Sequence, residues 1–369
     1  MKVLYVTTVG STMGFFKAFI NQLLQNGNTV DIATNENESK VPAEYGEWNC
    51  KTHHIDASRL PFSKSNAKAY KQLKEVINDG EYDIVHCHTP VAAMLTRLAA
   101  RKARKKGTRV IYTAHGFHFF KGAPIKNWLI YFPVEWLCSF FTDTLITINT
   151  EDFEFAKKHL HAKRTEYVHG VGIDTEKFKN IEVDREKKRE ELGIPKDSFA
   201  VLSVGELNDN KNHETILRAI AKIDRKDIVY VICGQGNKKE YLENLAKELG
   251  MEERLILAGY RKDIAEIYKC CDVFAFPSKR EGLPVSVMEA MASGLPCVVS
   301  NIRGNADLIN DEENGFLCSP LNVLDFADRI AVVAENKDLR NNFIKHGNVL
   351  ITPFSFAEVK TEMMKIYNL

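Results

Sequence analysis

Two glutamates in the segment EGLPVSVME, Glu281 and Glu289, lie eight residues apart around a Gly-Leu-Pro step. Pro284 suits the first position of a helix, because its missing N–H would have no partner there. Free amide groups at that helix start, near Gly282 and Leu283, favour an anion such as a diphosphate. The segment predicts a phosphate site flanked by two carboxylates, which can accept hydrogen bonds from sugar hydroxyls. Spacing alone equally allows one exposed loop acid and one acid on a helix surface.

Other basic residues and histidines could complete such a site. Lys211 in NDNKNHETILRAI comes just before a predicted helix, where a lysine opposes the helix dipole unless an anion is bound. Arg261 and Arg280 could add positive charge. The alternative interpretation of Lys211 is a solvated lysine. His115 ends the predicted strand RVIYTA and precedes a glycine, so we expect it to face a ligand. His118 follows in the same loop and could contact an acceptor or simply orient the loop.

Metal and dinucleotide chemistry are not expected. His86 and His88 share one face of the predicted strand DIVHCH, but no partner spacing supports a metal site, so we favour structural roles. The chain has no Asp-x-Asp motif, and we therefore expect a metal-independent site without a cofactor. Gly10 and Gly14 in VGSTMGFF could let the backbone approach an acceptor or a phosphate, but they lack the G-x-G-x-x-G spacing.

The elements that must position these residues are alternating strands and helices. Short β-branched runs such as KVLYVTT and RVIYTA alternate with segments of helical spacing, which is typical of an α/β fold with parallel sheets. The alternation pauses over residues 170–197 and then restarts with FAVLSVG. We therefore predict two Rossmann-like domains facing across a cleft, residues 1–175 and 176–369, with the last helix, about 355–369, packing back on the first domain.

The totals agree with a two-domain globular protein. The chain has 369 residues, more than one hydrophobic core usually serves. Its formal net charge is only +1, so a nucleic-acid partner is not expected and any membrane affinity must come from a local patch. The eight cysteines form no C-x-x-C pair, and we expect them to be reduced core residues of a cytosolic protein. No signal peptide or membrane span is expected.

Several motifs together resemble the retaining GT-B glycosyltransferases of family 4. They are DIVHCHTP, YTAHGFHF, GVGIDTEKF, VGELNDNKNHETIL, GYRKDIAEIY, EGLPVSVMEAMASGLPCV and NGFLCSP, which occur in the expected order over nearly the whole chain. The resemblance implies that Glu281 contacts the donor sugar, Glu289 the ribose hydroxyls and Lys211 the donor diphosphate. It also implies that His115 contacts the donor sugar and the reacting centre. Glu206 is a departure, because many members carry an arginine there that contacts phosphate.

The subgroup that the motifs resemble makes bacterial capsule and exopolysaccharide. The resemblance therefore implies a hexosyl- or N-acetylhexosaminyltransferase that uses a UDP-linked donor and a polyprenyl-diphosphate-linked saccharide as acceptor. Alternatives are a nucleotide-sugar epimerase of the same architecture, a cytosolic transferase acting on a small acceptor, and a non-catalytic nucleotide-sugar-binding subunit. The distinguishing observation is whether nucleotide diphosphate is released only when an acceptor is present.

An aromatic segment beside a basic one favours an anionic membrane surface as a further partner. Residues 117–141 hold nine aromatic side chains, and residues 97–109 hold seven Lys or Arg and no acid. Such a pair suits peripheral binding at the cytoplasmic face of the cell membrane. The opposing interpretation is that Trp128, Tyr131, Phe132 and Trp136 belong to the core and that the basic run is a solvated helix end.

Overall fold

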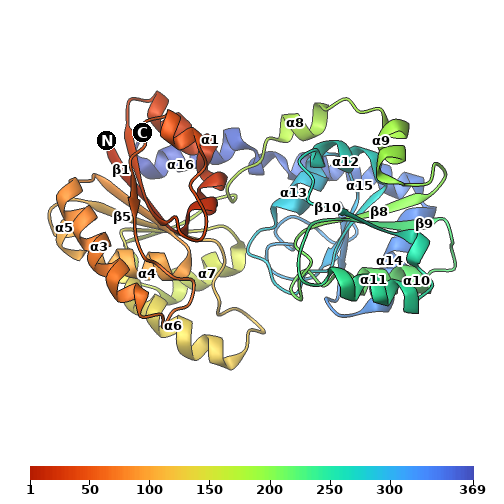
Figure 1. Cartoon of the computed structure of the whole chain (residues 1–369), viewed down its shortest axis with the longest axis horizontal. Coiled ribbons are helices and arrows are strands. Elements are labelled where there is room, and N and C mark those ends of the chain that lie inside the picture. Colours follow the sequence, from red (N-terminus) through yellow and green to blue (C-terminus); the bar gives the residue numbers. More distant parts are fainter. The chain divides into compact units, whose positions relative to one another are not determined.

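The structure, a computed structural model, describes residues 1–369 and divides into two compact units (Figure 1). The first unit comprises Met1–Val171 together with Lys360–Leu369, and the second comprises Gly172–Val359. The chain thus passes into the second unit just before the predicted boundary and returns to the first near its end. Each unit contains one parallel sheet covered by helices, which confirms the predicted α/β class with two Rossmann-like domains.

The first unit contains a seven-stranded sheet in the order β3-β2-β1-β4-β5-β6-β7. Its strands are β1 (Lys2–Val9), β2 (Thr29–Asn35), β3 (Thr52–His54), β4 (Ile84–His88), β5 (Arg109–Ala114), β6 (Thr144–Thr147) and β7 (Arg164–Tyr167). The helices are η1 (Gly10–Phe16), α1 (Lys17–Gln25), α2 (Glu44–Glu47), α3 (Ser65–Gly80), α4 (Pro90–Ala99), α5 (Arg101–Lys105), α6 (Ile125–Ser139), α7 (Thr150–His159) and most of α16 (Phe356–Tyr367). The short edge strand β3 lies in a stretch that the sequence pattern left undefined.

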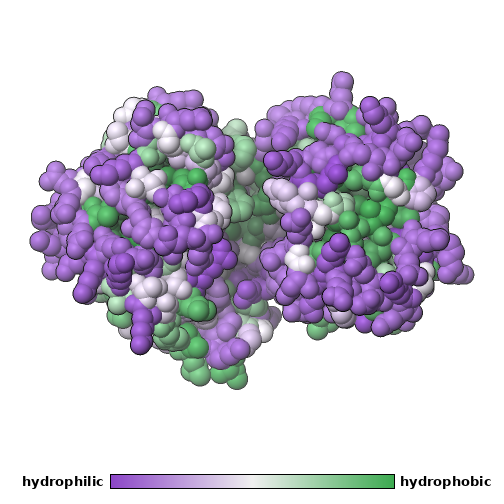
Figure 2. Space-filling model, in the orientation of Figure 1, coloured by the Kyte–Doolittle hydropathy of each residue, from purple (hydrophilic) through white to green (hydrophobic).

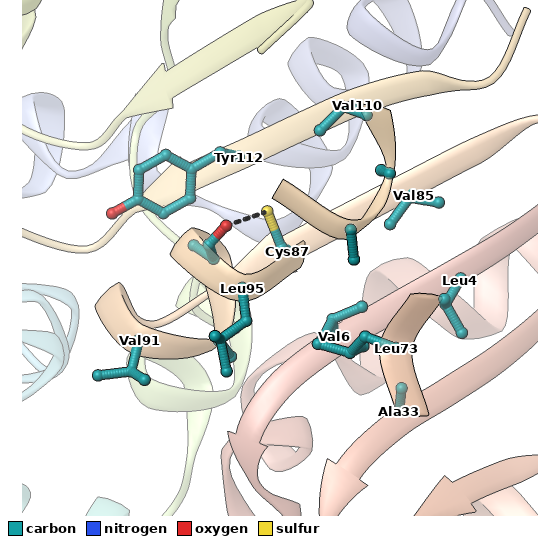
Figure 3. Packing of buried hydrophobic residues seen from close by; sticks show 14 of the residues in the cluster. Leu4, Val6, Ala33, Leu73, Val85, Cys87, Val91, Leu95, Val110 and Tyr112 are labelled. Atoms are coloured by element: carbon teal, nitrogen blue, oxygen red, sulfur yellow. Dashed lines mark hydrogen bonds between the residues drawn. The ribbon is translucent and has the colours of Figure 1, made fainter. Parts of the chain in front are cut away.

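Continuous hydrophobic runs form the strands because helices cover both faces of the sheet. Figure 3 shows part of the resulting core, in which Val6, Val85 and Val110 from neighbouring strands pack with Leu73 of α3 and Leu95 of α4. All of these side chains are buried. Most of the surface visible in Figure 2 is hydrophilic, but hydrophobic side chains gather over α6.

The second unit contains a six-stranded sheet in the order β10-β9-β8-β11-β12-β13. Its strands are β8 (Phe199–Val204), β9 (Ile228–Cys233), β10 (Leu255–Gly259), β11 (Val273–Phe276), β12 (Cys297–Ser300) and β13 (Gly315–Cys318). The helices are α8 (Thr175–Asn180), α9 (Arg185–Leu192), α10 (His213–Lys222), α11 (Lys239–Glu248), η2 (Glu252–Arg254), α12 (Ile264–Cys270), α13 (Val285–Ala292), α14 (Val323–Glu335), α15 (Lys337–Leu350) and η3 (Thr352–Phe354). Strand β13 was not predicted, because its sequence GFLC contains a glycine and no β-branched residue.

The strand order reverses at one place in each sheet, between β1 and β4 and between β8 and β11. Loops that leave the carboxyl ends of two such strands turn to opposite faces of the sheet, and ligands of open α/β sheets bind in the crevice between them. Lys211 and Glu281, two candidate residues of the second unit, follow the strands on either side of this place.

Helix α16 joins the first unit through buried polar contacts. The Tyr367 hydroxyl lies 3.2 Å from the Tyr5 hydroxyl and 2.7 Å from His86 Nδ1. Arg109 donates to the carbonyl oxygens of Ile366 and Tyr367 at 2.6 and 3.2 Å. These bonds satisfy carbonyl groups at the helix end, which have no partner within the helix.

All eight cysteines are buried and none forms a disulfide, as expected for small reduced core residues. No helix combines the length and the hydrophobicity that a membrane crossing requires.

Candidate functional site

The centre of the candidate site in the second unit is an ion pair between Lys211 and Glu281. Lys211 follows β8 and Glu281 follows β11, and their Nζ and Oε1 atoms are 2.7 Å apart. The Lys211 ammonium also lies 4.7 Å from the centre of the Phe276 ring. The two residues are 70 positions apart in the sequence and meet because β8 and β11 are neighbours where the strand order reverses. Their positive and negative groups face the same point at the carboxyl edge of the sheet.

Backbone and amide hydrogen bonds hold the two loops together around this pair. The Lys279 amide donates to the Asn210 carbonyl at 2.8 Å, and Asn210 Nδ2 donates to the Arg280 carbonyl at 3.0 Å. Asn212 adopts a left-handed backbone conformation, with φ of 54°, and its buried side chain donates to the Pro277 carbonyl at 3.2 Å. These hydrogen bonds join the loop that carries Lys211 to the loop after β11 and so fix the position of Lys211.

The amide groups at the start of α13 lie directly after Glu281. The N–H groups of Gly282, Leu283, Val285 and Ser286 donate no hydrogen bond within the protein, so they remain free for an anion. The helix begins one residue later than predicted. Pro284 is the N-cap with an extended backbone, whereas the sequence placed it at the first helical position.

Glu289 lies on the second turn of α13, half-buried beside Tyr268 of α12. The Tyr268 hydroxyl is 3.1 Å from Glu289 Oε2 and 3.1 Å from the Ser286 carbonyl oxygen. A phenol has one proton to donate, so the Tyr268 hydroxyl shares it between these two acceptor oxygens. Burial raises the pKa of Glu289 to about 7, against smaller lowering effects from Tyr268 and from Lys177 of α8.

The side chains of three other residues singled out from the sequence form no ion pair or hydrogen bond with Lys211 or Glu281. Arg261 is held by the carboxylates of Asp263 and Glu191, and its guanidinium Nε is 2.8 Å from Asp263 Oδ1. The structure thus gives Arg261 a role in an ion-pair network and does not bring it to Lys211. Arg280 is exposed and joins the site through its carbonyl group. Glu206 is exposed and accepts a hydrogen bond from Asn208 Nδ2 at 3.0 Å.

Two residues at the site were missed in the sequence, Tyr268 and Arg303. Tyr268 holds Glu289, and Arg303 Nε donates to the Glu281 carbonyl at 3.2 Å while its side chain is buried. The available signal for Tyr268 was its place in GYRKDIAEIYKCCD, just upstream of β11. No local pattern marks Arg303, which follows β12 in a loop without periodicity.

The first unit brings three histidines together at the carboxyl ends of β4 and β5. His115 Nε2 lies 3.1 Å from His88 Nδ1, and the Phe16 ring stacks on His88 with ring centres 4.1 Å apart. His86 Nε2 lies 2.8 Å from the Thr113 hydroxyl. Burial lowers the pKa of His115 to about 4 and that of His86 to about 3, and it lowers the pKa of His88 well below its usual value. The three rings are therefore neutral at neutral pH and can exchange hydrogen bonds with uncharged hydroxyl groups.

The remaining candidates of the first unit have separate surroundings. A Cβ atom at Gly10 would lie 2.4 Å from the Ser39 carbonyl oxygen, so close packing of its own chain requires this glycine. Gly14 is exposed and has open space beside it. The His118 ring lies tilted against the Tyr131 ring, with ring centres 4.6 Å apart, and lines an apolar cavity next to α6. The structure does not bring these three residues together.

Two family models match the chain, one over each half. The model described as "Glycosyl transferase 4-like" matches residues 2–149, and the model described as "Glycosyl transferases group 1" matches residues 184–349. The two matches correspond to the two units of the structure.

Curated relatives match along most of the chain. The chain is 39% identical to the glycosyltransferase EpsD of Bacillus subtilis, covering 100% of this chain and 96% of EpsD. It is 33% identical to the Escherichia coli UDP-Gal:alpha-D-GlcNAc-diphosphoundecaprenol alpha-1,3-galactosyltransferase, covering 82% of this chain and 79% of that enzyme. The solved structure of HepE from Anabaena in complex with UDP superposes with a TM-score of 0.82 and 19% identity, covering 100% of both chains. This last likeness establishes the fold.

Proposed function

The chain belongs to the GT-B glycosyltransferases of family 4, and from this premise we propose that it transfers a hexosyl or N-acetylhexosaminyl group from a UDP-sugar to a polyprenyl-diphosphate-linked saccharide. The acceptor class is supported by the Escherichia coli relative, whose name gives a diphosphoundecaprenol-linked acceptor and a UDP-linked donor. The product would belong to a bacterial surface polysaccharide such as capsule or exopolysaccharide.

One observation supports the assignment of the donor site: the cation of Lys211 lies beside the free amides at the N-terminus of α13. In the proposed reaction the bond between the sugar C1 and the diphosphate oxygen breaks, and negative charge grows on the departing phosphate. A fixed cation and fixed N–H groups stabilise that charge more than they stabilise the bound donor. Glu289 would accept the ribose hydroxyls, since it lies one helical turn further along α13.

We propose front-face attack with retention of the anomeric configuration. The acceptor oxygen bonds to C1 on the face from which the diphosphate leaves, and the acceptor proton passes to the departing phosphate oxygen. Glu281 is committed to Lys211 in the structure, which supports a positioning contact to the sugar rather than a nucleophilic role. Nuclear magnetic resonance of the first product tests this, because a product with the anomeric configuration opposite to that of the donor would contradict it.

We also propose that transfer needs no divalent metal, because Lys211 and the α13 amides supply the positive charge that a metal would otherwise provide. Addition of a chelator should leave the rate unchanged. Loss of activity with chelator that is restored by Mg²⁺ or Mn²⁺ would overturn this part of the proposal.

The lipid-linked acceptor is supported by one face of α6 in the first unit, which is exposed and almost entirely apolar. Ile125 is 77% exposed and Leu129 is 72% exposed, and the face continues through Val134, Trp136 and Phe140. Figure 2 shows hydrophobic side chains gathered over this helix. Contiguous apolar surface of this kind marks an interaction site. Three aromatic residues that the sequence could assign either to the core or to the surface, Trp128, Tyr131 and Phe132, pack against the core.

Unpaired cations lie at the carboxyl end of the same helix. Arg101, Lys102, Lys105 and Lys106 of the α5 region are exposed, and Arg101 lies over the Phe141 ring at 5.4 Å. The other three basic residues of the predicted cluster are committed elsewhere: Arg97 to Glu135, Arg104 to Asp143, and Arg109 to carbonyl groups of α16. An apolar face beside four free cations fits an anionic bilayer surface, and each cation near such a surface contributes about 1 kcal/mol.

The test of the transferase is to incubate the protein with a panel of UDP-sugars and a polyprenyl-diphosphate-linked N-acetylglucosamine. We expect UDP release only with the acceptor present. Isomerisation of the donor without acceptor would identify an epimerase, and donor binding without turnover would identify a binding subunit. Equal transfer to a short soluble saccharide would identify a cytosolic transferase for small acceptors.

The membrane part has its own test, co-sedimentation with anionic and neutral vesicles at low and high salt. We expect binding to anionic vesicles at low salt, weakened several-fold by Leu129→Glu. The matched control is Val349→Glu, which places the same charge at a residue of the second unit that is 68% exposed. Equal loss in both variants, or no binding by the unchanged protein, would contradict peripheral membrane binding through α6.

A further inference from the structure

A cavity in the first unit lies between α6, the residues after β5 and the loop that precedes α3. Its volume is about 350 Å³, within the range of small-molecule sites. The walls are mostly hydrophobic, and they include Phe62, Met94, Phe117, Leu129 and Val134. The donor site does not account for this space, although the motif YTAHGFHF supplies part of its wall.

The one charged residue in the wall is already neutralised. Glu135 lines the cavity, but its two carboxylate oxygens accept from Arg97 at 2.5 and 3.0 Å. Arg97 is itself buried, donates to the Ala93 carbonyl at 3.1 Å and lies over the Tyr112 ring at 4.3 Å. A saccharide would need several hydrogen-bond partners to replace its water. This cavity offers few of them, and it is better suited to a hydrocarbon.

The cavity and the exposed face of α6 share side chains. Leu129 and Val134 line the cavity and also belong to the apolar surface of the helix. Phe62, on the opposite wall, is 84% exposed. A hydrocarbon chain that left a bilayer at the α6 face could therefore enter the cavity along continuous apolar surface, and it would cover Phe62.

We propose that this cavity binds the isoprenoid units of the acceptor that are next to its diphosphate. This inference rests on the proposed function, since it assigns a subsite to the polyprenyl-linked acceptor. The cavity wall includes Gly116, Phe117 and His118, which directly follow His115 in the chain. Three residues of extended chain span at most about 10 Å. A diphosphate at the mouth of the cavity could thus place the attached saccharide near His115.

The experiment compares two acceptors that carry the same sugar diphosphate, one with a farnesyl chain and one with a methyl group, in solution without detergent or membranes. For the unchanged protein we expect kcat/KM to be at least about tenfold higher with the farnesyl acceptor, because apolar surface is buried. Met94→Trp fills the cavity from α4 and should abolish this preference. The matched control is Leu137→Trp, on the α6 surface outside the cavity, which should keep the preference.

A second variant tests the same cavity in case Met94→Trp does not fold. Phe62→Ala truncates an exposed wall residue and should lower the farnesyl preference while leaving the melting temperature unchanged. The cavity proposal is overturned if the unchanged protein transfers to both acceptors equally, or if Leu137→Trp removes the preference as fully as Met94→Trp does. The absence of transfer to any lipid-linked acceptor would instead overturn the proposed function.

Discussion

The two units place opposite chemistry at the same point of the same sheet topology. In the second unit the loops after β8 and β11 meet in the Lys211–Glu281 ion pair, next to free helix amides. In the first unit the chain after β1 and the end of β4 meet where Phe16 stacks on His88, and His88 in turn contacts His115. One crevice holds an ion pair beside free amides, and the other holds histidine rings whose pKa values burial lowers. The fold therefore supplies the position, and the side chains after each strand decide which ligand it suits.

This difference is consistent with a division of labour in which the second unit binds the nucleotide diphosphate and the histidine cluster of the first unit faces uncharged sugar hydroxyls. The histidines support it because burial holds their pKa values far below neutrality, so they do not attract an anion. If this division is correct, variants of the charged site in the second unit should affect nucleotide binding and diphosphate release. Variants of the histidine cluster should affect transfer alone.

The largest effect is expected from Lys211→Ala. Loss of the cation should lower turnover by about 10²-fold to 10³-fold, because charge on the departing diphosphate loses its main stabilisation. The measurement is kcat with saturating donor. Lys279→Ala is the control, since Lys279 is an exposed lysine in the adjoining loop and is not assigned to the diphosphate. Full activity of Lys211→Ala would end the assignment of this residue.

His115→Ala should reduce transfer by roughly 10²-fold, as expected when one positioned hydrogen-bonding group is lost from the reacting centre. UDP binding measured by calorimetry should not change, because His115 belongs to the other unit and is not assigned to the nucleotide. His346→Ala, which removes a partly exposed histidine of the second unit, serves as the control. If His115→Ala weakened UDP binding, the separation of the two units into charged and neutral sites would be wrong.

Donor binding should depend on pH through Glu289. Its pKa is raised to about 7, and a carboxylate accepts ribose hydroxyls better than a carboxylic acid does, so binding releases a proton below that pH. The affinity for a UDP-sugar should fall by at most about tenfold per pH unit below 7 and stay level above it. Calorimetry in two buffers of different ionisation enthalpy would count the released proton.

Two variants separate the causes of that pH dependence. Glu289→Gln should bind the donor about 1.5–3 kcal/mol more weakly and lose the pH dependence. Tyr268→Phe removes a hydrogen bond that lowers the pKa, so the loss of affinity should begin at a higher pH.

In the free protein the raised pKa means that the folded state loses stability as pH rises towards 7. Glu289→Gln should therefore be the more stable protein at pH 8. Unchanged pH profiles in both variants would show that Glu289 does not titrate in this range.

The smallest effect is expected from Glu281→Gln on nucleotide binding, in the direction opposite to its effect on transfer. The Lys211–Glu281 pair is partly exposed, at 21% and 14% of the two side chains, so its net contribution is about 1 kcal/mol. In Glu281→Gln the diphosphate of UDP no longer competes with a carboxylate for Lys211, so UDP should bind about fivefold more tightly. Transfer of the sugar should nevertheless be lost. Weaker UDP binding would show that Glu281 assists the nucleotide instead of competing for Lys211.

Local patterns in the sequence were sufficient for most of the strands and helices, although they did not reveal β3 or β13. Runs of β-branched residues and helical spacing depend on neighbours within a few positions, so strands such as β5 and β8 and the start of α13 were predicted to within a residue or two. Glu281 and Lys211 were singled out at junctions of a strand, a loop and a helix, and Glu289 by its place on the helix that follows Glu281. Their assignment to the donor site stays a prediction.

Only the tertiary structure decided which side chains meet. Lys211 and Glu281, Tyr268 and Glu289, and Arg97 and Glu135 come from different elements, and each pairing depends on strand order and helix packing that no local period encodes. The same packing divided the aromatic segment into core residues and the exposed face of α6, and it committed three of seven basic residues to partners. Sequence spacing fixes the direction in which a side chain leaves its own element, whereas its partner, its burial and therefore its charge state depend on residues that the fold brings from elsewhere.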